Sequence, residues 1–384
     1  MSVYICKIQI MPVRVPLKEA VWAPQLKIKF RDYLLVRLDY SDDSFGIGFS
    51  YIGTGGGLSA AIACKELLCE TVLGTSSTDP EDVQSRLKFI TRIQGRGGLV
   101  QNAISALDIA IWDRNARVQE LPLYQTLTAD TVKRVPAYAS GGYLTGSYNP
   151  DALEKEIDSY LQAGFVAIKL KCAFGTLPED LKRLELARKW MGDKTELMLD
   201  AYNRWQTVEE ALPAVTLYKD LNPYWVEDPF EPDLLFEMGE LKQQLNVRLA
   251  TGEFYFNASP FDFFARQGSA DIFQAEAPRC GGITEWLNIA SVAEEHCLEM
   301  APCWFHDLHV HLVAACPSAR YVEYFPKQDV LNFACLIDQP VTAEDGYVTV
   351  PQEPGLGFDF RYEMIERYRL GDIIILETGA PARS

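Results

Sequence analysis

The sequence is short of histidine, of positive charge and of long apolar runs. Its 384 residues include 4 histidines, and 36 lysines and arginines stand against 53 acids, which gives a net charge of −17. This balance disfavours nucleic acids and anionic membrane surfaces as partners. No apolar stretch approaches the roughly 18 residues of a membrane-spanning helix, and the chain shows no export signal. We therefore expect a cytoplasmic protein that does not bind membranes.

Paired cysteines are also lacking. The nine cysteines are an odd number, and they are scattered without the spacing of a metal finger, which indicates buried thiols. What the chain does have is 48% apolar and 11% aromatic residues, enough over this length to bury a large core. The length itself predicts two domains, or one large barrel with additions.

Four short apolar runs in the middle of the chain end in ionisable residues. One carries Lys169 and Lys171, and the others end at or near Asp200, Glu227 and Glu253. Each run is long enough for a buried strand and too short for a helix. The acids are 27 and 26 residues apart (227 − 200 and 253 − 227), about one strand-plus-helix unit of an eight-stranded barrel. The spacing predicts that three carboxylates meet at the ends of adjacent strands.

Three carboxylates in one cleft repel each other unless a cation cancels their charge. An all-oxygen set of ligands selects hard ions, and Mg²⁺ characteristically binds a few carboxylates while keeping places for water and substrate. Asp200, Glu227 and Glu253 therefore predict a site for one Mg²⁺. The alternative is that each acid only caps a helix or forms a surface ion pair.

The two lysines are predicted to face the mouth of the same barrel, because residues i and i+2 of a strand point to one side. Neighbouring ammonium groups lower each other's pKa, which can leave one neutral enough to act as a base near pH 7. We expect Lys171, nearer the end of the strand, to be the base and Lys169 its electrostatic partner. A Lys-x-Lys pair exposed on an edge strand is the alternative.

Around this region the pattern predicts an antiparallel sheet within residues 1–55, with strands at 4–13 and 33–40 around a loop at Trp22. Three amphipathic helices follow at 58–73, 80–90 and 99–118. From a strand at 135–142 onward, strands and helices alternate, which indicates a parallel sheet.

The Lys-x-Lys pair, the three acids and the stretch Gly281-Gly282-Ile283-Thr284-Glu285 resemble the enolase superfamily, specifically its mandelate racemase/muconate lactonizing enzyme family. The resemblance covers nearly the whole chain. It implies an α/β fold with a modified (β/α)8, TIM-like barrel at 129–345. An α+β capping domain is implied at 1–128, completed by the tail from about 346 to 384. The resemblance also implies a homo-oligomer, and a Glu323 that hydrogen-bonds the substrate carboxylate.

The family pattern breaks opposite the lysines, where an Asp–His pair is expected. Glu276 and Cys303 occupy those positions here. A thiol titrates near 8.5 and an imidazole near 6.5, so the two pairs are not equivalent. His306 in the following loop could take the role if that loop is re-registered. The sequence leaves Cys303, Glu276 and His306 open as the acid on this face.

Trp22, Tyr138, Ser140 and Tyr202 are candidate substrate-binding residues, although Tyr138 and Ser140 could equally be wall residues. The resemblance implies an enzyme that takes the α-proton from a small 2-hydroxy carboxylate, such as an acid sugar, and stabilises the ene-diolate with Mg²⁺, Lys169 and Glu323. Loss of a β-hydroxyl would make it an acid-sugar dehydratase, a lyase, and this is the favoured prediction. A racemase or epimerase of a hydroxy or amino carboxylate is the first alternative. A metal-retaining binding protein without turnover is the second.

Overall fold

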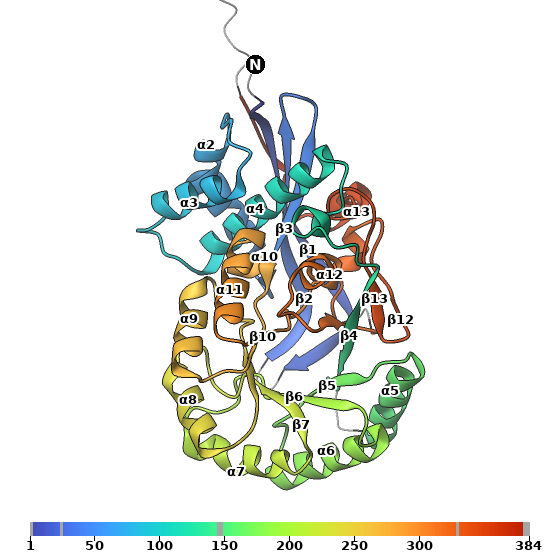
Figure 1. Cartoon of the computed structure of the whole chain (residues 1–384). Helices are drawn as coiled ribbons and strands as arrows, with labels where there is room; N and C mark the ends of the chain where they lie inside the picture. The colour runs from blue at the N-terminus through green and yellow to red at the C-terminus, as the bar shows by residue number, and fades with distance from the viewer. Residues whose placement is uncertain (1–2, 24–25, 144–148, 328–329, 379–384) are drawn as a thin grey trace, which may run out of the picture.

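The computed structural model describes residues 3–23, 26–143, 149–327 and 330–378. Figure 1 shows two parts, a sheet with helices at the top of the view and a barrel at the bottom. A long hairpin of the upper part runs down towards the barrel. The predicted fold class, a modified (β/α)8 barrel with an α+β capping domain, is confirmed.

The capping sheet has four strands in the order β14-β1-β2-β3. Its strands are β1 (Ile5–Ala23), β2 (Leu26–Tyr40), β3 (Phe45–Gly53) and β14 (Ile374–Glu377). The C-terminal β14 pairs antiparallel with β1, with Ile8 opposite Leu376. The tail of the chain therefore joins the N-terminal sheet.

Helices cover one face of this sheet. They are α1 (Gly57–Ala63), the π-helix η1 (Cys64–Leu68), α2 (Cys69–Val72), α3 (Pro80–Ile90) and α4 (Gly98–Val118). The long α4 lies directly on β3, because Gly46 and Gly48 have no side chain. A Cβ atom at either glycine would lie 2.0 Å from a carbonyl oxygen of α4. The predicted single helix at 58–73 is divided by the π-helical segment.

The hairpin of β1 and β2 is longer than predicted. Both strands continue through the expected loop, and Trp22 pairs with Lys27, although the side chain of Trp22 lies outside the described residues. A register shift between Pro16 and Val21 interrupts the period-2 pattern, and this hides the second half of β1 from the sequence. The extended hairpin is held by apolar side chains that pack into the same core as the barrel.

The barrel consists of eight parallel strands. They are β4 (Arg134–Gly141), β5 (Ala167–Lys171), β6 (Glu196–Asp200), β7 (Pro223–Glu227), β8 (Leu249–Thr251), β9 (Ile272–Phe273), β10 (Glu299–Met300) and β11 (Val322–Tyr324). A bridge between Met300 and Ala319 links β10 to the segment before β11, and β11 pairs with β4. The ring is thereby closed. The last strands are shorter than predicted, and Glu276 caps a helix instead of ending β9.

Seven of the strands are followed by helices that lie outside the ring (Figure 1). These helices are α5 (Pro150–Gln162), α6 (Leu177–Met191), α7 (Val208–Lys219), α8 (Leu235–Gln244), α9 (Ala258–Gln267), the pair α10 (Ala277–Cys280) and α11 (Ile283–Glu295), and α12 (His306–Ala315). After β11 the chain instead forms the short η3 (Phe333–Leu336). Within the described residues, the barrel is therefore modified at its eighth helix.

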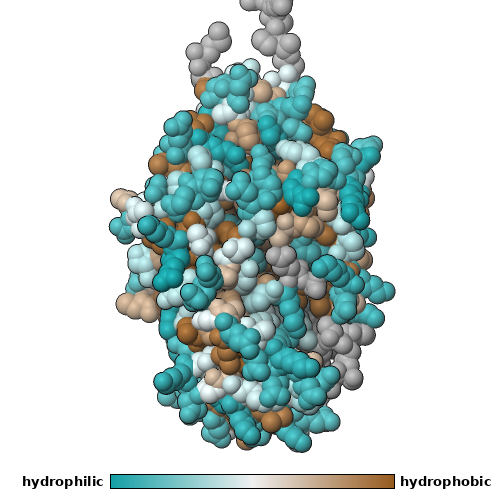
Figure 2. Space-filling view, turned by 90° about the vertical axis from the view of Figure 1, so that its right-hand side faces the viewer, coloured by the Kyte–Doolittle hydropathy of each residue, from teal (hydrophilic) through white to brown (hydrophobic). Residues whose placement is uncertain are grey.

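The remaining elements connect the two parts. They are η2 (Leu123–Thr126), β12 (Ala343–Glu344), β13 (Tyr347–Thr349) and α13 (Tyr362–Tyr368). The face of the molecule that Figure 2 shows is mostly hydrophilic, with scattered apolar residues. Among the described helices, none is both long and apolar enough to cross a membrane.

Inside the barrel, a ring of apolar side chains forms a floor. Its members are Tyr138, Ala167, Met198, Trp225, Ala250, Ile272, Ala301 and Tyr321, one from each strand or its extension. The Tyr138 and Trp225 rings meet edge to face at 5.5 Å. Because side chains alternate along a strand, the residues two positions later point into the barrel one layer higher. The floor therefore fixes which residues line the mouth.

Candidate active site

The layer above the floor is almost entirely polar. It contains Ser140, Lys169, Asp200, Glu227, Gly252, Gln274, Cys303 and Glu323, each two residues after a floor residue. Strand register places Asp200 opposite Glu227, and Lys171, which lies one layer above Lys169, is opposite Asp200. The predicted lysines and the first two acids therefore lie at neighbouring strand ends. Glu253 follows β8, one residue beyond Gly252.

The lysines and acids of this layer form one network of buried charges. The Nζ atom of Lys169 lies 2.7 Å from Glu227 Oε1, 2.8 Å from Glu323 Oε1 and 3.9 Å from Asp200 Oδ2. Lys171 forms an ion pair with Asp200. Each of these residues is at most 6% exposed. Burial of this many charges requires that they compensate each other, and the two ammonium groups compensate part of the negative charge.

Within the described ranges, no group of three or more acids, histidines or cysteines is close enough to form a ready-made metal site. The lysines lie among the carboxylates instead. Burial and then the charge of Asp200 raise the pKa of Glu227 well above its usual value, and Lys169 only partly opposes this. At Glu227, burial and the repulsion from Asp200 therefore outweigh the attraction to Lys169.

The pKa of Lys171 differs from the sequence-based expectation. Burial lowers it, but the Asp200 carboxylate and Tyr143 outweigh burial, so the pKa lies well above 10.5. The neighbouring ammonium of Lys169 has the expected lowering effect, but it is a minor contribution. The acids that the two lysines contact therefore matter more than the proximity of the lysines to each other.

Other side chains and peptide groups hold the acids in place. Gln274 Nε2 and Trp225 Nε1 donate to Glu227 Oε2, at 2.7 Å and 3.1 Å. Trp304 Nε1 donates to Glu253 Oε2 at 2.8 Å, and the Trp304 peptide N–H donates to Glu323 Oε2 at 2.6 Å. Sequence analysis missed these residues. The period-2 pattern of β9 could have indicated Gln274, whereas Trp304 lies in a turn that no strand pattern describes.

On the face opposite the lysines, Cys303 and Glu276 are both buried. The Cys303 thiol donates to the carbonyl of Gln274 at 3.2 Å, and burial together with Glu253 raises its pKa well above the usual range. Glu276 Oε2 accepts from Arg279 Nε at 3.2 Å, whereas Oε1 has no hydrogen-bond partner among the described residues. Burial raises the pKa of Glu276 to about 7, although Arg279 lowers it.

The structure places His306 outside this group. Its ring lies 4.8 Å from the ring of Tyr324, and Nε2 is 3.7 Å from Asp307 Oδ2. Tyr324 follows Glu323 on β11 and therefore faces away from the mouth, because side chains alternate. The hypothesis that His306 takes the place of the missing histidine does not match its position here.

The candidate substrate-binding residues differ in position. Tyr138 belongs to the floor, and the hydroxyls of Tyr138 and Ser140 are buried without a hydrogen-bond partner among the described residues. The Tyr202 ring centroid lies 4.9 Å from Lys171 Nζ, and the ring of Tyr143, which sequence analysis did not identify, lies 5.1 Å from it. Two tyrosines therefore flank Lys171.

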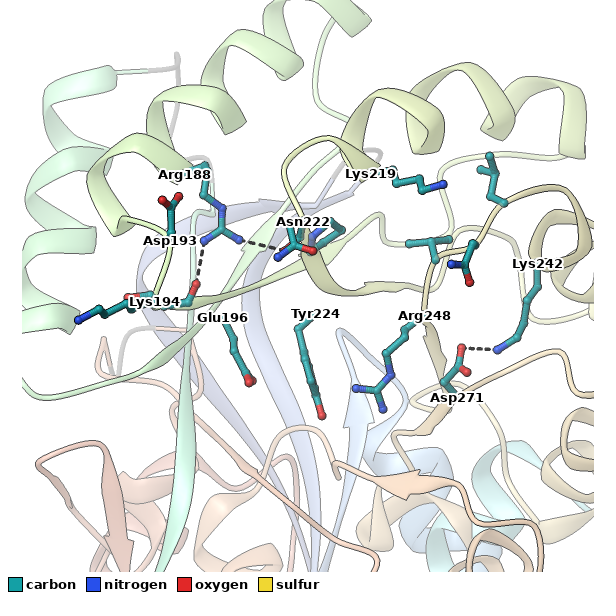
Figure 3. Close-up of a pocket in the computed structure, with 15 residues that line it drawn as sticks. Arg188, Asp193, Lys194, Glu196, Lys219, Asn222, Tyr224, Lys242, Arg248 and Asp271 are labelled. Carbon is teal, nitrogen blue, oxygen red and sulfur yellow. Dashed lines mark hydrogen bonds and ion pairs between the residues drawn. The ribbon is translucent and has the colours of Figure 1, made fainter.

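A pocket of about 750 Å³ lies at the end of the barrel opposite the lysines and acids, where the strands begin (Figure 3). Three of its charged side chains, Lys242, Arg248 and Asp271, form ion pairs. Lys242 pairs with Asp271, and Arg248 Nη2 lies 3.0 Å from Glu299 Oε2. Chemistry in such barrels takes place at the C-terminal ends of the strands, whereas the N-terminal end contributes stability. We assign this pocket to the stability of the fold.

Two family descriptions match the chain. "Mandelate racemase / muconate lactonizing enzyme, N-terminal domain" matches residues 6–128, and "Enolase C-terminal domain-like" matches residues 152–364. The chain is 31% identical to the L-talarate/galactarate dehydratase of Salmonella typhimurium over 320 residues, which is 83% of this chain and 78% of that enzyme. It is 30% identical to the 3,6-anhydro-alpha-L-galactonate cycloisomerase of Streptomyces coelicolor over 342 residues, 88% of this chain and 92% of the other.

Solved structures agree over nearly the full length. A racemase from Streptomyces coelicolor with bound magnesium has a TM-score of 0.89 at 28% identity, covering 95% of this chain and 100% of the other. L-talarate dehydratase from Polaromonas sp., complexed with Mg and L-glucarate, has a TM-score of 0.87 at 28% identity, with 98% and 100% covered. The chain therefore belongs to the mandelate racemase/muconate lactonizing enzyme family of the enolase superfamily.

Proposed function

We propose that this protein is a magnesium-dependent dehydratase of acid sugars. It removes the proton next to the substrate carboxylate and eliminates the hydroxyl on the following carbon, which leaves a 2-keto acid. The observation that carries the proposal is the buried network in which Lys169, Asp200, Glu227 and Glu323 are in contact and Lys171 lies one layer higher. The names of the relatives, which include dehydratases and magnesium-bound structures, support the same reaction class.

Asp200, Glu227 and Glu253 are the residues that would hold one Mg²⁺. They are three buried carboxylates at the ends of adjacent strands, and oxygen donors of this kind select a hard divalent ion. Burial first and then the neighbouring Asp200 raise the pKa of Glu227, and the positive charge of a bound ion would offset the repulsion between these two carboxylates. When bound, the ion supplies positive charge that stabilises the negative charge developing on the substrate carboxylate.

In this proposal Lys171 is the base, and its Nζ receives the α-proton. Burial lowers the pKa of Lys171, and the Asp200 carboxylate is the group that raises it most. If a divalent ion offset the charge of Asp200, the pKa of Lys171 would fall and the neutral amine would be favoured. Lys169 and Glu323, which lie 2.8 Å apart, hydrogen-bond the substrate carboxylate.

The leaving hydroxyl needs a proton to depart as water, and Glu276 is the better donor of the two residues on the far face. A carboxyl with a pKa of about 7 is protonated in part near neutral pH and has one oxygen without a hydrogen-bond partner among the described residues. The Cys303 thiol is already donating to a backbone carbonyl, and its pKa is higher. The enol that remains after loss of water then becomes the 2-keto acid.

The test uses a library of acid sugars with Mg²⁺ in deuterated water, and follows both 2-keto acid and exchange of the α-hydrogen. We expect Lys171→Ala to lose both while it still binds Mg²⁺. Lys194→Ala is the matched control, because this exposed lysine lies at the opposite end of the barrel (Figure 3). Exchange with change of configuration but no dehydration would favour a racemase or epimerase. Neither exchange nor product from any acid would favour a binding protein.

The far-face assignment is tested by comparing Glu276→Gln, Cys303→Ser and His306→Ala. If Glu276 is the acid, its variant should lose dehydration while α-hydrogen exchange on the Lys171 face persists. The other two variants should keep most of the activity. Loss of dehydration in Cys303→Ser alone would transfer the role to the thiol.

A further inference from the structure

Arg31 on β2 is a buried cation without a carboxylate partner among the described residues. Its side chain is 1% exposed, Nε donates to the carbonyl of Val330 at 2.7 Å, and Nη1 donates to the Tyr51 hydroxyl at 2.6 Å. The remaining Nη2 atom is buried and makes no hydrogen bond to any residue that the structure describes. A buried guanidinium normally pairs with an acid, as the buried Arg183 does with Asp180 at 2.8 Å. Within the described part of the chain, Arg31 therefore has a donor without an acceptor and a charge without an acid partner.

This cation lies against the active site. Its Cζ atom is 4.5 Å from the ring centroid of Trp304, the residue that donates to both Glu253 and Glu323. The Tyr51 ring that Arg31 contacts is stacked on Trp304 at 5.9 Å. One side chain therefore separates the guanidinium from the acids of the barrel mouth.

A second arginine approaches the same point. Arg279, the partner of Glu276, has its Cζ atom 5.7 Å from the Tyr51 ring. Two guanidinium groups, one on the capping domain and one on the barrel, thus lie 5.5 Å and 5.7 Å from the centre of the Tyr51 ring. Arg279 is already paired with Glu276, so among the described residues Arg31 is the cation at this place that remains for an anionic group to bind.

We propose that Arg31 binds a second carboxylate at the far end of the substrate, so that the preferred substrates are dicarboxylic acid sugars. This inference rests on the proposed function. One carboxylate would contact Lys169 and Glu323, and the other would accept from Nη2 of Arg31. The planar guanidinium is suited to a carboxylate, and a hydrogen bond between opposite charges is stronger than a neutral one. The names of the relatives cover several acid sugars. Membership of the family therefore does not by itself decide whether the substrate carries one carboxylate or two.

The experiment compares six-carbon aldarates with the aldonates of the same configuration, which carry CH2OH in place of the second carboxylate. We expect the wild type to favour the aldarate in kcat/KM and in calorimetric binding with Mg²⁺ present. Arg31→Met should reduce that preference by about 10²- to 10³-fold, as expected when one partner of a buried charge pair is removed. The aldonate values should change little.

Two further variants keep the test decisive. Arg31→Lys retains the charge and should retain part of the preference, which separates binding from a failure to fold. Arg37→Met, on the same strand but paired with Asp39 at 2.8 Å, should leave the preference unchanged. Asp329, which precedes Val330 in the sequence, lies outside the described residues, and the test therefore includes the case in which Asp329 is the acid partner of Arg31. In that case Asp329→Asn and Arg31→Met would lower stability equally, and neither would alter the preference.

The outcomes distinguish this inference from the proposed function. Dehydration of aldonates and aldarates at equal kcat/KM would overturn the dicarboxylate inference and leave the dehydratase intact. Tighter binding of aldarates that depends on Arg31, without turnover or α-hydrogen exchange, would support the subsite and overturn the dehydratase. Equal binding of both acids would overturn the subsite.

Discussion

Replacing Trp304 with Phe removes one hydrogen-bond donor from the candidate metal site. The indole Nε1 donates to Glu253 Oε2 at 2.8 Å, whereas the peptide N–H that contacts Glu323 is unaffected by the change. The phenyl ring can keep the stacking on Phe325, now at 5.1 Å. The substitution therefore tests the hydrogen bond to Glu253 separately from the packing around Trp304.

The size of the effect follows from the charge on the acceptor. A hydrogen bond to a charged group contributes about 1.5–3 kcal/mol. A factor of ten corresponds to about 1.4 kcal/mol, so complete loss of the benefit would weaken Mg²⁺ binding by about 10- to 150-fold. Replacement of outer partners of metal ligands typically costs about 10- to 100-fold, in the same range. We expect a loss of Mg²⁺ affinity of about 10- to 100-fold.

Titration calorimetry with Mg²⁺ measures this directly. The matched control is Trp286→Phe, because Trp286 Nε1 donates at 3.1 Å to the carbonyl of Ala275 and makes no contact with the three acids. That variant should lower the melting temperature without changing the affinity for Mg²⁺. An unchanged dissociation constant in Trp304→Phe, or an equal loss in both variants, would refute the assignment of Glu253 as a ligand held by Trp304.

Three other predictions follow from the site and the core. Glu227→Gln should sharply reduce bound magnesium in elemental analysis, because it removes a negative charge from the site. For Glu276, the pKa rises from 4.5 to about 7 on burial, so its contribution to stability is present below pH 4.5 and is lost as the pH rises to about 7. Relative to Glu276→Gln, the wild type should therefore lose about 3 kcal/mol across that range in urea unfolding with a chelator present. Phe49→Ala should cost about 3–5 kcal/mol, because this buried ring stacks at 4.2 Å on Phe333 between the capping domain and the barrel, and urea unfolding would measure the loss.

Sequence patterns predicted the barrel and the strand-end position of its charged residues because both depend on local rules. Side chains alternate along a strand, and strand-plus-helix units repeat at a nearly constant length. Lys169, Asp200 and Glu227 could therefore be placed in one layer from their spacing alone. The same rule applied to residues 272–276 would have identified Gln274 as well. The second half of β1 was hidden because a register shift breaks the alternation at Pro16.

Tertiary structure alone decided the charge state of the site and the residues that support it. The pKa of Lys171 depends on its distance to Asp200 and on burial, and neither follows from the order of residues. Arg31 contacts Val330 across 299 positions of sequence, so no local pattern could bring it to the mouth. The turn at Trp304 has a φ of 59°, outside any strand, and it directs the indole towards Glu253. Local periodicity thus determined which strand residues face the barrel mouth. Their ion pairs, their pKa values and the position of Arg31 depend on contacts between segments distant in sequence.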